Sequence, residues 1–269
     1  MNFYQGNETI DILSKKAEEK NKMSFIRLFL LGILGGAFIA LGYLAYLRIV
    51  GAMSKELNGI GLFLGASIFP IGLISIYLMN AELATGNTLT MTLGYLDKKV
   101  KISQVVYNWL VVAISNILGA VLVAYFFGHI VGLTEGAYLE TTLNIANSKI
   151  EASTMSALIS GLGGNIFVCT AVWIATSAKT LAGKIFGLWF PVMIFIVIGL
   201  QHAVANAFII PAAIFSGQAT ITILDFLTNF LTVFLGNALG GAIVVAIPVF
   251  MSNRKCNSLN TCELPYSGD

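Results

Sequence analysis

Two ionisable side chains stand alone inside long apolar stretches of this sequence. His202 is the only ionisable residue in the stretch 185–224, and Glu82 is the only charged residue in 57–96. An isolated imidazole can donate a hydrogen bond to an anion or exchange a proton with it. The structural alternative is a buried neutral histidine bonded to a neighbour. Thr85, close to Glu82, has a hydroxyl that could bind a ligand or cap a helix.

Three further kinds of residue could contribute to such a site. Asn165 interrupts an apolar segment after two glycines, and either bonds neighbouring helices together or contacts a ligand. Lys149 is the only cation in the segment 135–151, and either attracts anions or is an ordinary surface lysine. Bulky apolar residues near the polar ones could narrow a passage or pack in the core: Phe69, Leu83 and Phe195.

The composition excludes several classes of protein. Hydrophobic residues make up 57% of the 269 residues and charged residues only 10%, whereas soluble domains are about 25% charged. Most of the chain must therefore lie in lipid. A net charge of +2 leaves no basic face for nucleic acid. The sequence has neither an enzyme motif nor a metal-ligand spacing, so we expect no enzymatic activity, no cofactor and no metal ion.

Long stretches without charge predict six membrane-spanning segments. A helix needs about 20 residues to cross about 30 Å of hydrocarbon. The segments are 28–47, 57–96 apart from Glu82, 102–134, 152–178, 185–224 and 226–253. Before them, residues 8–22 carry apolar side chains at helical spacing, which predicts a short amphipathic helix at the membrane surface.

The distribution of Lys and Arg indicates that each long stretch crosses the membrane once. A single crossing of 57–96 and of 185–224 places 12 of the 15 basic residues on one side of the membrane. Positive charge concentrates on the cytoplasmic side. We therefore expect a multi-pass protein of the cell membrane with both termini in the cytoplasm.

A single crossing by 40 residues requires a break in the helix. Polar residues and glycines indicate the breaks at 82–87 in the first long stretch, and at Gly199, 201–206 and Pro211 in the second. Irregular backbone at membrane depth is tolerated only inside protein or beside a cavity, so a binding or permeation site is expected between the two breaks. Residues expected to stabilise the breaks are Glu82, through backbone N–H groups, Gly86, Asn87 and Asn206.

The chain repeats itself. The segment 115–119 (Ser-Asn-Ile-Leu-Gly) resembles 236–240 (Gly-Asn-Ala-Leu-Gly), and Asn87 has a counterpart in Asn206. Each repeat contains three crossings, so the second must be inverted, as in many transporters. We expect an all-α membrane protein, with an N-terminal helix in 1–24, one repeat in 25–130, an inverted repeat in 152–251 and a cytoplasmic tail in 252–269.

Three segments resemble motifs of the formate/nitrite transporter family. Residues 80–88 (Asn-Ala-Glu-Leu-Ala-Thr-Gly-Asn-Thr) resemble its A-E-L-x-T-G/S-N loop, and residues 201–211 its E/D-H-S-x-A-N-M-x-x-x-P signature. Residues 164–173 resemble its N-x-x-V-C-x-A-V-W segment. The resemblance covers all six predicted crossings.

The resemblance implies an aquaporin-like protomer, assembled as a homopentamer, that conducts hydrosulfide (HS⁻), formate or nitrite. It implies that His202, Thr85 and Asn165 line the pore, that Lys149 attracts anions in a vestibule, and that three apolar residues form constrictions: Phe69, Leu83 and Phe195.

Departures from the motifs bear on the substrate. Gln201 replaces the usual acid, Ala203 the common Ser, and Ala84 a Phe that is common in formate channels. The sequence is most similar to the clostridial hydrosulfide-channel branch of the family, which implies hydrosulfide first, formate second and nitrite third. The alternatives are a proton-coupled formate/nitrite transporter, a neutral-solute facilitator, and a membrane hydrolase using His202 with Thr85.

Overall fold

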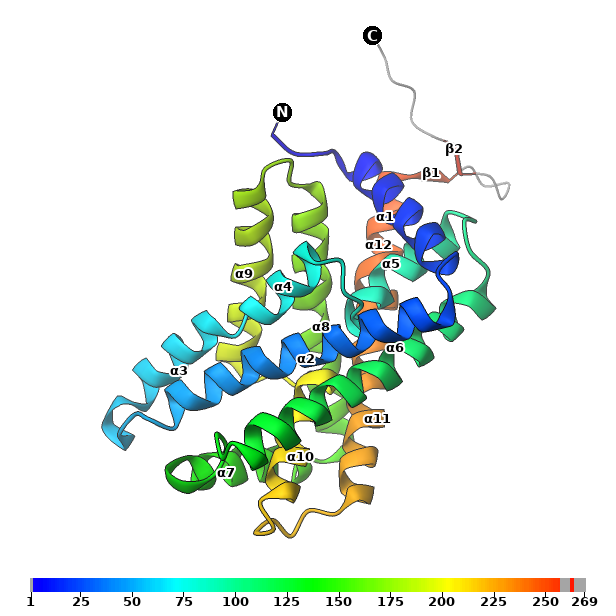
Figure 1. Ribbon diagram of the computed structural model, residues 1–269. Helices are drawn as coiled ribbons and strands as arrows, with labels where there is room; N and C mark the ends of the chain where they lie inside the picture. The colour runs from blue at the N-terminus through cyan, green and yellow to red at the C-terminus, as the bar shows by residue number, and fades with distance from the viewer. Residues whose placement is uncertain (1, 257–261, 264–269) are drawn as a thin grey trace.

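The protein is a bundle of helices (Figure 1). The computed structural model describes residues 2–256, 262 and 263; the predicted tail, 252–269, therefore lies mostly outside them. The α-helices are α1 (Gly6–Asn21), α2 (Phe25–Val50), α3 (Asn58–Ile68), α4 (Ile71–Leu78), α5 (Ala84–Leu96), α6 (Ile102–Val123), α7 (Leu139–Ile150), α8 (Thr154–Ser177), α9 (Leu181–Ile198), α10 (Ala203–Phe215), α11 (Ile223–Leu239) and α12 (Ile247–Asn253).

Short elements complete the chain. Two π-helices, η2 (Ala124–Ile130) and η4 (Gly240–Ala246), continue α6 and α11, and the 3₁₀ helices are η1 (Lys55–Leu57) and η3 (Gly136–Tyr138). The strands β1 (Lys255–Cys256) and β2 (Cys262–Glu263) pair antiparallel after the last helix.

Six helical segments are long and apolar enough to span a membrane, as predicted. They are Phe25–Val50, Lys55–Leu78, Ile102–Ile130, Thr154–Ser177, Leu181–Ile198 and Ile223–Asn253. Ser or Thr side chains cap several of them; the Ser24 hydroxyl, for example, accepts a hydrogen bond from the N–H of Arg27 at 3.3 Å. The prediction of an all-α membrane fold with six spans is confirmed.

Both long stretches are broken, but the breaks are shorter than predicted. The first break is residues 79–83 and the second is 199–202, where Gly199 has φ of +85°. The polar residues Thr85, Gly86 and Asn87 lie in the first turn of α5, and Pro211 lies inside α10. Assigning them to irregular backbone was wrong. An unpredicted interruption at Pro70 separates α3 from α4, since proline cannot donate a backbone hydrogen bond.

The two repeats pack in the same way. Helix α2 lies against α6, and α8 lies against α11. A methyl group on Gly119 would lie 2.0 Å from the carbonyl oxygen of Ile33, and one on Gly240 would lie 2.3 Å from that of Leu162. These equivalent glycines let the paired helices approach closely at matching points.

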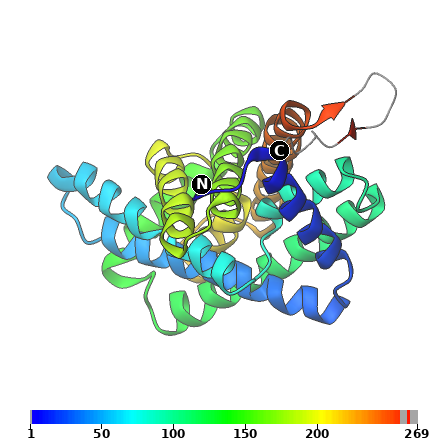
Figure 2. The ribbon, with the colours of Figure 1, turned by 90° about the horizontal axis from the view of Figure 1, so that it is seen from above.

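Helix α1 packs against the rest of the helical bundle. Its apolar residues Ile10 and Leu13 are fully buried in one cluster with Leu89 and Leu93 of α5. The apolar face that predicted a helix at the membrane surface is covered by the bundle. Figure 1 shows α1 at the end of the molecule that also holds β1, whereas α7 lies toward the opposite end, and Figure 2 views the molecule from the α1 end.

Candidate functional site

A hydrogen bond joins the two broken helices. Thr85 is the second residue of α5, and His202 directly precedes α10. The Thr85 Oγ1 and the His202 Nε2 lie 2.8 Å apart, and both side chains are buried. Residues 117 positions apart in the chain therefore meet in one pair.

The other ring nitrogen of His202 determines the direction of that bond. His202 is the N-cap of α10, and its Nδ1 accepts the backbone N–H of Ala205 at 3.2 Å. A nitrogen that accepts cannot carry a proton, so the neutral ring carries its hydrogen on Nε2. Nε2 then donates to the Thr85 oxygen, and the Thr85 hydroxyl hydrogen is left to donate elsewhere.

Asn116 holds the start of the first half-helix. Its Oδ1 accepts the N–H of Ala84 at 2.9 Å, and its Nδ2 donates to the carbonyl oxygens of Gly32 at 2.7 Å and Glu82 at 2.8 Å. One side chain on α6 thus satisfies backbone groups that the break leaves without helical partners.

Asn237 of α11 does the same in the second repeat. Its Oδ1 accepts the N–H of Ala203 at 3.0 Å, and its Nδ2 donates to the carbonyl oxygens of Gly161 at 2.6 Å and Gln201 at 3.4 Å. The N-termini of α5 and α10, each with a partial positive charge, are thereby fixed beside the Thr85–His202 pair.

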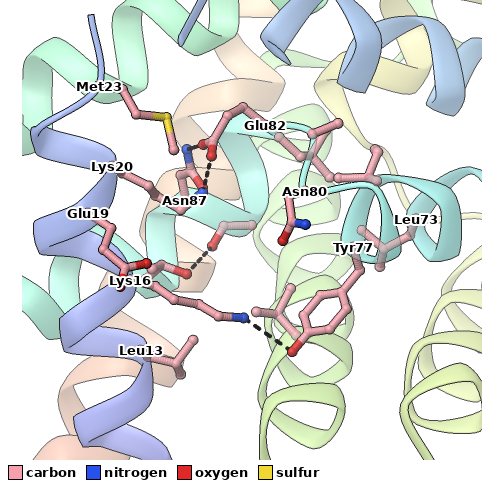
Figure 3. A pocket seen from close by; sticks show the side chains of 16 residues that line it. Leu13, Lys16, Glu19, Lys20, Met23, Leu73, Tyr77, Asn80, Glu82 and Asn87 are labelled. Atoms are coloured by element: carbon pink, nitrogen blue, oxygen red, sulfur yellow. Dashed lines mark hydrogen bonds and ion pairs between the residues drawn. The ribbon is translucent and has the colours of Figure 1, made fainter. Parts of the chain in front are cut away.

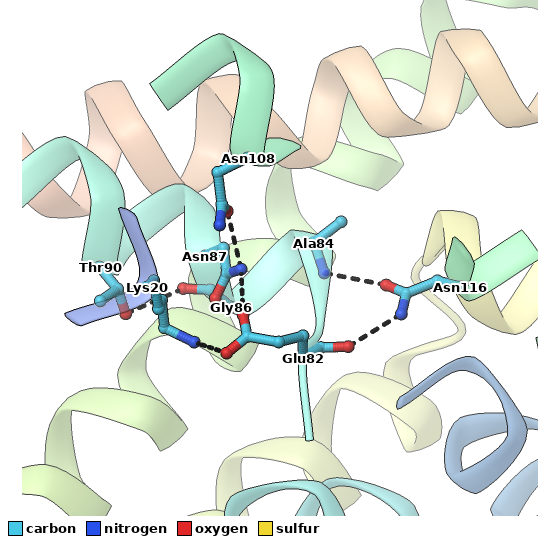
Figure 4. Close-up of polar contacts among 8 residues, drawn as sticks. All are labelled: Lys20, Glu82, Ala84, Gly86, Asn87, Thr90, Asn108 and Asn116. Atoms are coloured by element: carbon cyan, nitrogen blue, oxygen red, sulfur yellow. Dashed lines mark hydrogen bonds and ion pairs between the residues drawn. The ribbon is translucent and has the colours of Figure 1, made fainter. Parts of the chain in front are cut away.

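An ion pair occupies the first break (Figure 4). Glu82, which is 2% exposed, pairs with Lys20 of α1 and accepts a hydrogen bond from Asn87 Nδ2 at 2.7 Å; Asn87 Nδ2 also bonds Asn108 Oδ1 at 2.8 Å. We predicted backbone N–H partners for the Glu82 carboxylate, and the partners are instead two side chains. The glutamate therefore does not stand in the break as an unpaired negative charge.

Gln201 occupies the equivalent place in the second break. Its Oε1 accepts from Asn206 Nδ2 at 2.8 Å and from Asn229 Nδ2 at 3.3 Å. Asn87 and Asn206 thus lie where the repeat predicts and make equivalent bonds. Gly86 lies in the first turn of α5, where a methyl group would meet Val172 only at 3.5 Å, an ordinary contact.

Apolar side chains flank the pair. The ring of Phe195 lies 6.1 Å from that of His202, and the ring of Phe69 lies edge-on to Phe195 at 5.9 Å. Both are buried, as is Leu83, which directly precedes α5. The three residues proposed as constrictions therefore lie near the two breaks.

A cavity lies on each side of these residues. The α1-side vestibule is lined by α1, α4 and α5, and the six residues that characterise it are Lys16, Lys20, Tyr77, Asn80, Glu82 and Leu83 (Figure 3). The α7-side vestibule is lined, among others, by Tyr43, Lys149, Phe195, Gly199 and His202. Leu83 lines the first cavity, and His202 and Phe195 line the second, so the polar pair and its apolar neighbours lie between the two.

Lys149 lines the same cavity as His202, the α7-side vestibule. Its side chain is half-buried, and burial lowers the pKa of its ammonium from the usual value. Within the described chain no carboxylate forms an ion pair with it.

Asn165 lies behind Thr85. Its side chain is fully buried, and its Nδ2 donates to the carbonyl oxygens of Thr85 at 3.2 Å and Asn237 at 2.6 Å and to Thr88 Oγ1 at 2.9 Å. Among the residues that the structure describes, none forms a hydrogen bond with its Oδ1. These bonds from α8 to α5 and α11 match the interhelical role that the sequence left open.

Sequence reasoning missed the residues that α1 and α4 contribute to the α1-side vestibule, Lys16, Lys20 and Tyr77. Lys16 Nζ lies 3.4 Å from Tyr77 Oη, and burial together with the neighbouring Lys20 lowers the pKa of Lys16. The signal was the spacing of Lys16 and Lys20 by one helical turn, which places both on one face of α1. Their target could not be identified before α1 was placed.

The sequence profile described as formate/nitrite transporter matches residues 7–251. The chain belongs to this family. It is 46% identical over 221 residues to the uncharacterized transporter YrhG of Bacillus subtilis (strain 168), covering 82% of this chain and 83% of that relative. It is 39% identical over 220 residues to the formate channel BtFdhC of Bacillus thuringiensis, covering 82% and 85%.

Solved structures agree with the family assignment. A structure described as an "FNT family ion channel" superposes with a TM-score of 0.85 at 22% identity, covering 91% of this chain and 98% of that one. A "Pentameric formate channel with formate bound" superposes with a TM-score of 0.75 at 27% identity, covering 85% and 97%. The inverted three-helix repeats with broken helices are thus the fold of the formate/nitrite transporter family. These relatives are named as channels or transporters, and none as an enzyme.

Proposed function

We propose that the chain forms a channel for small monovalent anions of weak acids. The observation that carries the proposal is the Thr85–His202 hydrogen bond, which lies beside two half-helix N-termini and between two vestibules. The helix ends and the Thr85 hydroxyl supply hydrogen-bond donors for an anion, and the Glu82 carboxylate does not oppose them as an unpaired charge, because it is paired with Lys20.

The apolar residues provide selectivity in this proposal. A permanently charged ion loses its hydration beside Phe69, Phe195 and Leu83 and gains little in return, so its passage is costly. The conjugate base of a weak acid has an alternative, because it can take up a proton and cross as a neutral molecule. Lys149 concentrates such anions at the α7-side mouth.

We propose that the channel conducts formate, hydrosulfide and nitrite, and we place formate first. The relative named as a formate channel supports formate. Hydrosulfide rests on the departures from the family motifs at Ala84, Gln201 and Ala203; the small Ala84 is fully buried directly after Leu83. We further propose a homopentamer with one pore in each protomer, supported by the structural neighbour that is a pentameric formate channel, and both termini in the cytoplasm.

Flux into proteoliposomes containing the purified full-length protein tests the proposal. We expect formate, hydrosulfide and nitrite to enter much faster than chloride, each measured with and without a pH gradient. Flux that requires the gradient would assign proton-coupled transport, and flux down the anion gradient alone would assign a channel. Uptake of glycerol without selective anion flux would overturn the proposal in favour of a neutral-solute facilitator.

A further inference from the structure

The backbone carbonyl of Thr85 is held from several sides. It accepts the hydroxyl of Thr88 at 2.6 Å and the Asn165 amide at 3.2 Å, and the thiol of Cys169 lies 3.8 Å away. All three side chains are fully buried. The residue whose hydroxyl meets His202 is thus fixed through its own backbone by side chains outside both vestibules.

Asn165 has no polar equivalent in the first repeat. Gly32, Gly35 and Phe38 of the first repeat match Gly161, Gly164 and Phe167 of the second, and the same offset aligns Gly36 with Asn165. A methyl on Gly36 would lie 2.0 Å from the carbonyl oxygen of Asn116, so that helix pair packs backbone to backbone. In the second repeat the Asn165 amide bonds the equivalent carbonyl, that of Asn237, at 2.6 Å.

This asymmetry connects the two half-helices. Asn237 bonds the backbone on both sides of His202, at Gln201 and Ala203. The same Asn165 amide bonds Asn237 and the carbonyl of Thr85. Three acceptors surround its Nδ2, which excludes a flipped amide. The Asn165 side chain therefore contacts both the backbone carbonyl of Thr85 and Asn237, the residue that bonds the backbone on both sides of His202.

Gly241 makes room for this cluster. A methyl group there would lie 1.9 Å from Thr88 Oγ1, 2.7 Å from Asn165 Nδ2 and 2.9 Å from Cys169 Sγ. Gly241 is part of the π-helix η4, a type of segment often found near functional sites. At Gly241 the backbone of the sixth span therefore lies directly against the polar cluster, with no side chain between them.

We propose that Thr88 and Asn165 are positioning residues, which set the anion selectivity of the pore by holding the hydroxyl of Thr85 on Nε2 of His202. The inference rests on the proposed channel function. Neither residue contacts the anion. They act by fixing the carbonyl of Thr85 and thereby the first turn of α5.

The test compares the formate-to-chloride flux ratio of full-length variants in proteoliposomes. Thr88→Val keeps the shape and removes the hydroxyl, and should lower the ratio by about 3- to 10-fold, the range that one neutral hydrogen bond supports. Thr88→Ser, which keeps a hydroxyl, should have the wild-type ratio. Thr170→Val is the matched control, because Thr170 also bonds a carbonyl of its own helix, that of Ile166 at 2.8 Å, and should leave the ratio unchanged.

A double variant separates positioning from general packing. If Thr88 acts through Thr85, Thr88→Val should have no further effect on the ratio once Thr85→Val has removed the hydroxyl. The inference would be overturned if the effects of the two substitutions multiply in the double variant, or if the ratio is unchanged in Thr88→Val. It would also be overturned if Thr88→Ser does not have the wild-type ratio. If Thr88→Val does not fold, Asn165→Gly is the second test, because glycine is the residue that the first repeat has at this position. Asn165→Gly should also lower the formate-to-chloride ratio, and a wild-type ratio in this variant would overturn the inference. Absence of selective flux in the wild type would instead contradict the proposed function.

Discussion

Glu82 and Gln201 occupy equivalent places in the two repeats, and the ion pair of Glu82 with Lys20 is the main difference between them. Each side chain accepts a bond from the asparagine five residues later, Asn87 at 2.7 Å and Asn206 at 2.8 Å. Only the carboxylate requires a cation, which α1 supplies. The second break is stabilised without charge, so in the part of the chain that the structure describes only the first break has an ion pair with α1.

Replacing Lys20 by Met should destabilise the protein. It leaves the nearly buried Glu82 carboxylate without its cation, a change that costs roughly 3 kcal/mol when buried pairs are broken. Adding Glu82→Gln should recover most of the loss, because Gln201 shows that an amide makes the same bonds. Unfolding in detergent with increasing denaturant measures both effects.

The control for that experiment is Lys22→Met. Lys22 pairs with Glu18 on the surface of α1, where its side chain is 69% exposed, and such pairs contribute at most about 1 kcal/mol. Equal losses in Lys20→Met and Lys22→Met would contradict the special role of the Glu82 pair.

Removing the amide of Asn116 should disorder the first break. Asn116→Ala leaves two buried backbone groups at the break, the Glu82 carbonyl and the Ala84 N–H, without the amide that bonds them, at a cost of about 1–3 kcal/mol each. We expect a lower melting temperature and faster proteolysis within residues 79–84. Asn237→Ala should act equally in the second break, at 199–203. Stability close to that of Asn108→Ala, which removes only the bond to Asn87, would argue against the role of these frames.

The six spans were predictable because the exclusion of charge from hydrocarbon is a local property of the sequence. The start of α5 was not. Thr85, Gly86 and Asn87 have low helix propensity, yet they are helical because Asn116, on another helix, bonds the backbone that starts it. Tertiary contacts decided the boundary.

The partners in the site show the same limit. Motif resemblance pointed to Thr85 and His202 as pore residues, but their bond, and the N-cap that orients His202, depend on how two distant breaks meet. The amphipathic face of α1 could equally cover lipid or protein. Only its docking on α5 shows that Lys20 reaches Glu82.

Lys149→Glu should lower anion flux, mainly at low ionic strength. The charge acts on anions in the vestibule through solvent, and about 0.1 M salt screens it beyond about 10 Å. Flux measured in about 0.01 M and about 0.5 M salt separates an electrostatic effect of Lys149 from a structural one. Lys55→Glu, an exposed change of equal charge outside the vestibule lining, should have a smaller effect. A loss independent of salt would indicate a structural role for Lys149.

The pH dependence of the Lys149 effect follows from its pKa. Because burial lowers the pKa, the ammonium is present below that pKa and is lost as the pH rises through it. The loss occurs at a lower pH than for an exposed lysine. We therefore expect the flux advantage of wild type over Lys149→Gln to shrink on the alkaline side before that of an exposed lysine would. An advantage that grows with pH would contradict this.

His202→Asn should keep the fold and change the transport. Asn is a preferred N-cap and can still accept the N–H of Ala205, so α10 should start in the same place. Its shorter side chain lacks the Nε2 that bonds Thr85 at 2.8 Å, and it does not titrate near neutral pH. The flux of formate should then lose any pH dependence that comes from the imidazole. Flux measured against pH in the same liposomes for both proteins tests this.

The contribution of the anion itself must be separated from that of His202. Formate flux also varies with pH because the fraction of formic acid varies, whereas chloride has no protonated form in this range. If His202 exchanges a proton with the anion, His202→Asn should flatten the formate profile, and the dependence on formic acid that remains should match the solution titration of the acid. Thr85→Val provides the comparison, since it removes the partner oxygen and leaves the imidazole free to titrate; it should alter selectivity while keeping the pH dependence. Identical pH profiles in wild type and His202→Asn would show that the imidazole only caps α10 and bonds Thr85, and that the anion gains its proton in a vestibule.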